Sequence, residues 1–175
     1  MEINLEQAFD EPVDLSHQLD VPLARLDRPE LVALGPVMFH GRLQKSEVGF
    51  VLSGRIDFDG AVACARCLAD VPFARHGPVT WVFVPAHKSV EAEAAGETEL
   101  AEGDLDVVVY DDLTVDFDPL VDEQIQLELP MKALCKDTCR GLCPTCGANL
   151  NEAPCSCPPV QDDRWGALKS LLPPT

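Results

Sequence analysis

The sequence has no long apolar run. No stretch approaches the roughly 18–20 uninterrupted apolar residues that a helix needs to cross a bilayer, so we expect no membrane span. Residues 1–6 contain two acids and lack the basic start and apolar run of a secretory signal peptide. We therefore expect a soluble, cytoplasmic protein.

Basic residues are also scarce. The 175 residues include 13 Lys and Arg against 30 Asp and Glu, for a formal net charge of −17. This balance excludes a protein that coats nucleic acid through a broadly basic surface. Residues 1–129 carry −18 and residues 130–175 carry +1, so the acidity belongs to the body of the chain. An acidic body attracts basic partners; the alternative is a solvated acidic surface with no specific partner.

Recognisable catalytic motifs are absent. The sequence contains no Gly-rich phosphate loop, no nucleophile elbow and no metalloprotease helix. The acids are not paired at any telling spacing, and the four histidines are scattered: His17, His40, His76 and His87. We therefore expect neither an enzyme nor a small-molecule substrate.

Cysteine is too rare for a disulfide scaffold but is clustered. Eight cysteines in 175 residues lie below the roughly 8–10% of such scaffolds, and six of them fall within 23 residues. Disulfides do not persist in a reducing cytosol, so thiols at short fixed spacings favour metal ligands. The tail reads Cys135-x3-Cys139-x3-Cys143-x2-Cys146-x8-Cys155-x-Cys157.

The spacing in the tail predicts a local zinc site. A Cys-x-x-Cys turn aims two sulfurs at one point and leaves half of a tetrahedral site for a second pair. The eight residues between Cys146 and Cys155 are enough for the chain to loop back. Cys143, Cys146, Cys155 and Cys157 can therefore close one site.

By elimination, a second site would join distant parts of the chain. Cys135 and Cys139 have the i, i+4 spacing of one face of a helical turn, and only Cys64 and Cys67 remain to complete their set. The alternative is that Cys64 and Cys67 are buried or weakly redox-active thiols. Four thiolates leave no open position for water, so two zinc ions held in this way would be structural.

Three other functions could in principle use cysteines at these spacings. The spacing Cys139-x3-Cys143-x2-Cys146 is that of radical S-adenosylmethionine enzymes, but only 29 residues follow Cys146, too few for the barrel that such a motif opens. An iron-sulfur protein stays open as an alternative, because sequence does not separate iron from zinc. A zinc-thiolate redox sensor is a second open alternative.

Hydrophobic periodicity predicts an α+β fold. We expect an antiparallel β-sheet or partly open barrel core, one or two short helices, and a cysteine-rich, zinc-binding C-terminal segment. Three parts are expected: an N-terminal lead-in (1–35), a β core (36–129), and a zinc-binding tail with a C-terminal helix (130–175). The lead-in is irregular except for a strand near 13–21 and one helical turn at 29–32.

Within the β core, period-two alternation predicts strands at 36–44 and from 50, and the second is expected to continue past Asp59–Gly60 to Cys64. A third strand spans 78–85 between two prolines, and a fourth spans 105–110. An acidic loop covers 86–104. A helix over 118–129 has Asp118 as N-cap, and the tail ends in a helix at 162–172.

Several motifs fall in the order and spacing of the YceD family of large ribosomal RNA subunit accumulation proteins. They are Cys-Ala-Arg-Cys-Leu (64–68), Glu-Gln-Ile-Gln-Leu-Glu-Leu-Pro (123–130), Leu-Cys (134–135), Cys-Arg-Gly-Leu-Cys-Pro-Thr-Cys-Gly-Ala-Asn-Leu-Asn (139–151) and Arg-Trp-Gly-Ala-Leu (164–168). The chain resembles this family from about residue 36 to its end, and Gly-Leu-Cys-Pro-x-Cys-Gly is the specific part.

The resemblance implies a non-enzymatic bacterial cytoplasmic factor that supports accumulation of large-subunit ribosomal RNA, with the eight cysteines at the family's cysteine positions. The expected partners are a basic large-subunit ribosomal protein, a 23S rRNA precursor, or both. We expect the acidic body to engage the protein. The near-neutral tail, with Lys132, Lys136 and Arg140 beside the thiolates, would make any RNA contact.

Overall fold

The computed structural model describes residues 1–87 and 107–158. The chain divides into two compact units. The sheet unit comprises Met1–Val62 and Pro72–Met131, and the cysteine unit comprises Ala63–Val71 and Lys132–Thr175. Most of the predicted acidic loop and the whole of the predicted C-terminal helix lie outside the described residues.

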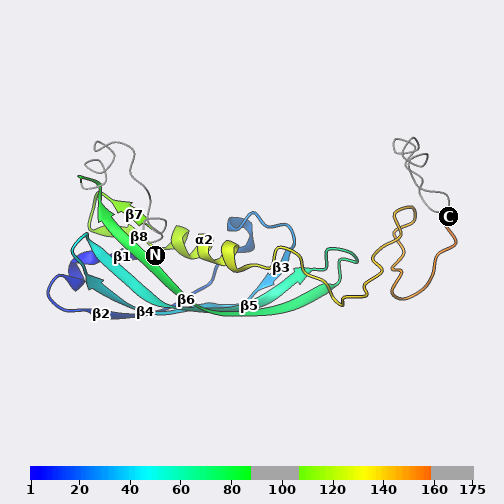
Figure 1. Ribbon diagram of the computed structural model, residues 1–175, viewed down its shortest axis with the longest axis horizontal. Helices are drawn as coiled ribbons and strands as arrows, with labels where there is room; N and C mark the ends of the chain where they lie inside the picture. Colours follow the sequence, from blue (N-terminus) through cyan, green and yellow to red (C-terminus); the bar gives the residue numbers. More distant parts are fainter. Residues whose placement is uncertain (88–106, 159–175) are drawn as a thin grey trace, which may run out of the picture. The chain divides into compact units, whose positions relative to one another are not determined.

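The sheet unit contains a curved β-sheet with the strand order β2-β4-β5-β6-β7 (Figure 1). Its strands are β2 (Val13–Leu19), β3 (Leu31–Leu34), β4 (Val37–Lys45), β5 (Phe50–Ala63), β6 (Asp70–Pro85) and β7 (Val107–Tyr110). β4 pairs antiparallel with both β2 and β5, and β3 pairs antiparallel with β5. The β6–β7 pair is parallel, which the expected antiparallel pattern did not include.

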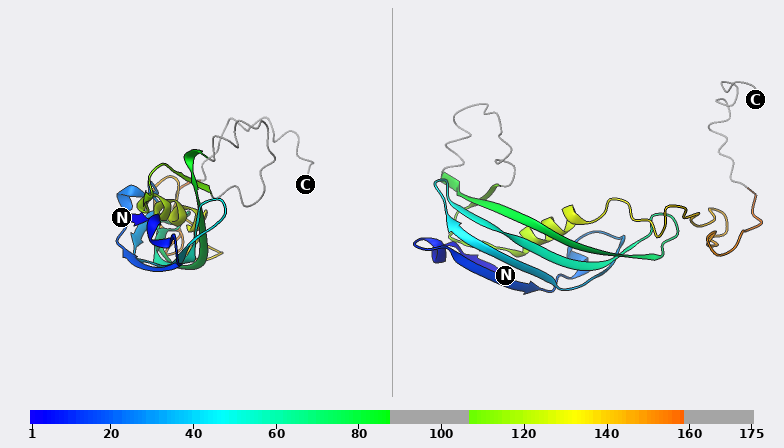
Figure 2. Two further views of the ribbon diagram at one scale, coloured as in Figure 1. Left: turned by 90° about the vertical axis from the view of Figure 1, so that its left-hand side faces the viewer. Right: turned by 60° about the horizontal axis from the view of Figure 1, so that its bottom comes forward.

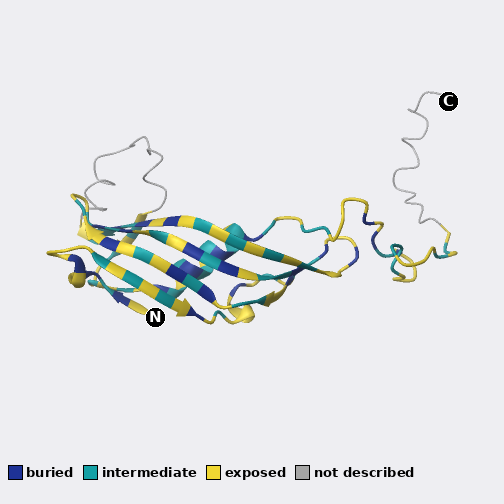
Figure 3. Cartoon of the chain, turned by 90° about the horizontal axis from the view of Figure 1, so that it is seen from below, coloured by how far each residue is buried: buried dark blue, intermediate teal, exposed yellow. Residues whose placement is uncertain are grey.

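The central strands form where apolar and polar side chains alternate. Every second residue of β4 and β5 faces the core, and the bands of buried and exposed residues are visible along the strands in Figure 3. The fully buried members include Phe39, Leu43, Leu52 and Ile56. These two strand predictions are confirmed, and β5 runs without interruption past Asp59–Gly60 to Ala63.

Helix α2 (Asp118–Glu128) lies across the concave face of the sheet (Figures 1 and 2). Val121, Ile125 and Leu129 are buried at steps of four, as the periodicity predicts. Phe117, at the start of the helix, packs its ring 5.0 Å from that of Phe39 between centroids. The predicted helix and the α+β fold are therefore confirmed.

The remaining elements are short. β1 (Glu2–Asn4) pairs antiparallel with β8 (Thr114–Asp116), and two 3-10 turns, η1 (Leu5–Ala8) and η2 (Leu23–Arg25), flank β2. In the part of the chain that the structure describes, no helix has the length and apolar character needed to cross a membrane.

The predicted helical turn at 29–32 is wrong, because Leu31–Leu34 forms strand β3. β4 pairs with β5 only as far as Asp57, so the backbone groups at the end of β5 need another partner. β3 supplies it by pairing with residues 60–62. A non-local requirement therefore overrides the local pattern.

The proline boundary of the third predicted strand is also wrong at one end. β6 begins at Asp70 and includes Pro78, although it does end at Pro85. Among the described strands, β7 pairs only with the last four residues of β6. Pro78 thus lies where the second edge of β6 has no described partner strand, and a residue without an N–H is tolerated there.

Asp118 does not cap α2. The N-cap position is Phe117, which makes no side-chain capping hydrogen bond, and Asp118 is the first helical residue. Its carboxylate accepts hydrogen bonds from the Arg25 guanidinium at 3.3 Å and forms an ion pair with the Met1 amino group at 2.7 Å. These partners take up the side chain that would otherwise cap the helix.

Candidate metal centres

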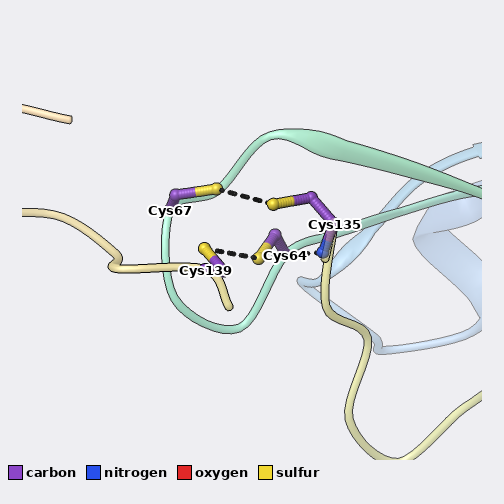
Figure 4. Close-up of side chains that lie close together, drawn as sticks. All are labelled: Cys64, Cys67, Cys135 and Cys139. Carbon is purple, nitrogen blue, oxygen red and sulfur yellow. Dashed lines mark hydrogen bonds between the residues drawn. The ribbon is translucent and has the colours of Figure 1, made fainter. Parts of the chain in front are cut away.

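Four cysteines converge at the turn between β5 and β6. Cys64 and Cys67 lie on this turn, and Cys135 and Cys139 lie on the segment that follows α2; we call this set cluster A (Figure 4). All four sulfur atoms lie within 4.8 Å of one another. Cys64 Sγ is 3.9 Å from Cys139 Sγ, and Cys67 Sγ is 3.5 Å from Cys135 Sγ.

These separations fit a shared metal ion and not disulfides. A disulfide holds its sulfurs about 2.05 Å apart, and all eight cysteines are free thiols. Four sulfurs at about 2.3 Å from a tetrahedral zinc ion are about 3.8 Å from each other. The two sulfur separations of cluster A given above bracket this value.

The other four cysteines form a second set within the same unit. Cluster B consists of Cys143, Cys146, Cys155 and Cys157, whose sulfur atoms also all lie within 4.8 Å of one another. The structure thus gathers the eight residues into the same two sets of four that their spacing suggests. Each set could hold one metal ion.

The two Cys-x-x-Cys turns share one backbone design. We call residues 64–69 knuckle A and residues 143–148 knuckle B. In both, the N–H of the first cysteine donates to the carbonyl five residues later at 2.8 Å. The N–H that follows the second cysteine donates back to the first cysteine's carbonyl, at 3.0 Å in knuckle A and 2.9 Å in knuckle B. That following residue has positive φ in each: 61° at Leu68 and 74° at Gly147.

The segment from Cys135 to Cys139 is not the helical turn that the i, i+4 spacing suggests. It is one tight turn in which the Cys139 N–H donates to the Lys136 carbonyl at 3.0 Å. Both sulfurs nevertheless lie in cluster A. The Cys135 N–H also donates to Cys64 Sγ at 3.4 Å. The spacing therefore does not arise from a helical turn.

Backbone amides prepare the first cysteine of each knuckle for ionisation. Hydrogen bonds from backbone N–H groups, that of Arg66 foremost, lower the pKa of the Cys64 thiol to about 6. In knuckle B, hydrogen bonds headed by the Cys146 N–H lower the pKa of Cys143 to about 6 as well. The lowered pKa favours the thiolate form of both groups, which is the form that binds metal.

Other thiols of the same clusters shift the opposite way. Contact with the Cys67 side chain raises the pKa of Cys135 to about 12, and contact with Cys146 raises the pKa of Cys157 to about 12. Four negative sulfurs at this distance repel one another, so the clusters cannot ionise completely without a counter-charge. A bound cation removes this penalty, and four thiolates leave it no open position for water.

Asn151 is a site residue that the cysteine spacing did not reveal. Its side-chain amide donates to Cys139 Sγ at 3.3 Å, although it lies in the loop between Cys146 and Cys155. Burial raises the pKa of Cys139, but the hydrogen bonds that Cys139 accepts, that of Asn151 foremost, lower it by more. The sequence feature that could have indicated this contact is the pair of asparagines, Asn149 and Asn151, that closely follows the Cys-x-x-Cys-Gly turn.

Two histidines of the sheet have hydrogen-bond partners away from the cysteines. His40 and His76 are exposed and hydrogen-bond Ser16 at 2.9 Å and Asp57 at 2.7 Å. In the described residues, the groups of metal-binding side chains that converge are the two cysteine clusters.

Comparison with known protein families identifies the family of this chain. The profile of the family described as large ribosomal RNA subunit accumulation protein YceD matches residues 52–172, more than half of the chain and all eight cysteines. The chain belongs to the YceD family. The resemblance inferred from the cysteine motifs is thereby confirmed.

The relatives of this YceD chain include bacterial and plastid proteins. An uncharacterized protein of Mycobacterium tuberculosis is 29% identical over 133 residues, which cover 76% of this chain and 60% of the relative. The uncharacterized protein YlbN of Bacillus subtilis is 30% identical over 132 residues, which cover 73% of this chain and 64% of YlbN. A maize protein named large ribosomal RNA subunit accumulation protein YCED homolog 1, chloroplastic, is 43% identical over 62 residues. These residues cover 35% of this chain and 21% of the maize protein.

The chain spans about 60% of the length of the Mycobacterium bovis and Mycobacterium tuberculosis relatives that it matches. No solved structure matches it.

Proposed function

We propose that this protein is a non-catalytic factor that supports accumulation of large-subunit ribosomal RNA in the bacterial cytoplasm, with two structural zinc ions. The observation that carries the proposal is the pair of four-cysteine clusters in a chain of the YceD family. Saturated thiolate sites of this kind hold a fold together and offer no open coordination position for catalysis.

Zinc is favoured over an iron-sulfur cluster by the size of each sulfur set. In both clusters every sulfur lies within 4.8 Å of every other, a separation that suits four ligands of one ion. A polynuclear iron-sulfur core is wider and spreads its cysteine ligands around several iron atoms. Tetrahedral four-sulfur sites with short Cys-x-x-Cys spacings are typical of structural zinc.

The two units carry different charge and are proposed to serve different partners. The acidic residues of 1–129 favour a basic protein, and a large-subunit ribosomal protein is the partner that we propose. The cysteine unit exposes Arg66, Lys132, Lys136 and Arg140 around cluster A. These cations suit contact with the phosphates of a 23S rRNA precursor.

The structure refines which acids can test the protein contact. Asp122 is paired with Arg25 at 2.6 Å, so changing it would disturb the sheet unit. Glu123 is exposed on the same helix. Glu123→Gln is therefore the variant that removes charge without removing this ion pair.

The cellular role can be tested by gene replacement in a bacterium that depends on its own YceD protein. The wild-type chain should restore the ratio of 23S to 16S rRNA, and Cys143→Ser with Cys146→Ser should not. Ser156→Ala, at an exposed position between two cluster B cysteines, is the matched control. Full restoration by the double cysteine variant would contradict a role for the metal-bound fold.

The partner can be tested with purified components. Affinity for basic large-subunit proteins and for 23S rRNA should be measured across a salt series, because both contacts weaken as salt screens them. We expect tighter binding to a ribosomal protein than to bare RNA. Tight RNA binding with no affinity for any ribosomal protein would overturn the proposed division of roles.

A further inference from the structure

The two metal centres are separated by only three residues. Cys139 belongs to cluster A and Cys143 to cluster B, and residues 140–142 connect them. This connector is hydrogen-bonded on both sides, to knuckle A and to the loop of cluster B. The connector therefore links the surroundings of one cluster to those of the other.

On one side the connector is tied to knuckle A. The Leu142 N–H donates to the Arg66 carbonyl at 3.0 Å, and the Arg66 guanidinium donates to the Cys139 carbonyl at 2.8 Å. Gly141 has φ +77°, and a Cβ there would lie 3.0 Å from the Arg66 carbonyl oxygen. This close approach and conformation favour glycine at that position.

On the other side the connector is tied to the loop between Cys146 and Cys155. The Leu150 N–H donates to the Gly141 carbonyl at 2.9 Å, and Leu142 forms a bridge with Asn149. The Asn151 side chain completes this side: its Oδ1 accepts from the Arg140 N–H at 2.9 Å, while its Nδ2 donates to Cys139 Sγ at 3.3 Å.

Asn151 lies in the loop that a metal ion at cluster B would close. Its loop is bounded by Cys146 and Cys155, so a metal ion that draws these sulfurs together also closes the loop. The closed loop is held further by the Asn149 side chain, whose Oδ1 accepts from both the Asn151 backbone and its amide group. One side chain thus touches a cluster A sulfur from a loop that cluster B closes.

We propose that Asn151 is a positioning residue that couples the two centres, so that metal bound at cluster B tightens metal binding at cluster A. This inference rests on the proposed metal sites. Hydrogen bonds to ligating groups typically change metal affinity 10–100-fold when they are removed. Because linkage is reciprocal, metal at cluster A strengthens binding at cluster B by the same factor.

The critical variant is Asn151→Asp in the full chain. Aspartate keeps an oxygen that can accept from the Arg140 N–H, but it loses the amide N–H groups that donate to Cys139 Sγ and to Asn149 Oδ1, and it adds a negative charge beside the cluster A sulfurs. If the hydrogen bond to sulfur matters, zinc affinity at cluster A falls 10–100-fold. If Asn151 only shapes the loop through Oδ1, affinity does not change and the proposal is overturned.

A double-mutant cycle isolates the coupling. Zinc dissociation constants are measured by competition with a chromogenic chelator for the wild type, Asn151→Asp, Cys155→Ser with Cys157→Ser, and the three changes combined. Cobalt substitution provides a second readout, since the sulfur-to-cobalt absorption reports the thiolate coordination of each site. Ser156→Ala, at the exposed position between Cys155 and Cys157, serves as the control.

We expect loss of cluster B to weaken cluster A about tenfold or more in the wild type and to have no further effect in the Asn151→Asp background. Equal weakening in both backgrounds would show that Asn151 does not carry the coupling. A wild-type chain that binds no metal would overturn the proposed metal sites themselves. Two bound ions with unchanged affinities in Asn151→Asp would overturn the coupling alone.

Discussion

Removal of metal should unfold the cysteine unit while the sheet unit persists. The described apolar side chains that pack around cluster A are few: Val71, Leu134 and Leu142, all only partly buried. Each would contribute at most about 1.5–3 kcal/mol if it were fully buried. The sheet unit, in contrast, contains a continuous core that includes Phe39, Phe83 and Phe117.

The metal contribution is larger than this apolar contribution. A structural zinc ion in a small module provides about 10–16 kcal/mol of apparent binding free energy at neutral pH. Three partly buried side chains provide well under about 9 kcal/mol together. Without metal, the burial that remains does not offset the entropy of ordering the described cysteine unit.

Amide hydrogen exchange after chelation measures this directly. The N–H groups of Cys64, Leu142, Cys143 and Leu150 are hydrogen-bonded within the unit and should lose protection. Amides of β4 and β5 in the sheet unit are the internal control and should stay protected. Metal analysis must first show that the chelator has emptied both sites. Unchanged protection of the four amides in metal-free protein would refute the reasoning.

Three further outcomes are expected. Metal analysis should give two zinc ions per wild-type chain and one after Cys143→Ser with Cys146→Ser; two ions in that variant would contradict the ligand assignment. Zinc affinity should fall progressively as pH drops, because protons compete with the metal for every thiolate, and the fall should be steepest once pH passes below about 6, where Cys64 and Cys143, whose pKa values are lowered, protonate last; isothermal titration at several pH values checks this. Phe39→Ala should destabilise the fully buried core by about 3–5 kcal/mol, whereas Leu127→Ala, at a side chain 74% exposed, should change stability by at most about 0.5 kcal/mol, as urea unfolding can show.

The predictable part of the fold is the part whose signal is local. β4 and β5 alternate strictly, and α2 repeats its apolar residues at steps of four, so their buried faces follow from the sequence. β3 and the parallel β6–β7 pair depend on which backbone groups other strands leave unpaired. Such requirements arise only once the sheet has formed, so hydrophobic periodicity does not predict them.

In the candidate site too, the sequence predicts the local features and not the non-local contacts. A Cys-x-x-Cys turn brings its two sulfurs together through local backbone geometry, and counting the remaining cysteines suggests their partners. Asn151 is different, because its contact with Cys139 crosses from one cluster's loop to the other cluster's ligand. No spacing rule for cysteine ligands marks an amide that donates to sulfur, although such outer contacts are common at metal sites.

The two knuckles show how far a motif determines a backbone. Gly147 follows the second cysteine of knuckle B, and glycine adopts its φ of +74° without steric cost. Leu68 takes the equivalent place in knuckle A at φ +61°, a conformation that costs an ordinary residue about 1–2 kcal/mol. Its side chain is 65% exposed, so burial offsets little of that cost. The hydrogen bonds and sulfur geometry of cluster A must therefore hold Leu68 in place, and the Cys-x-x-Cys spacing determines the turn even where the residue after it is unfavourable.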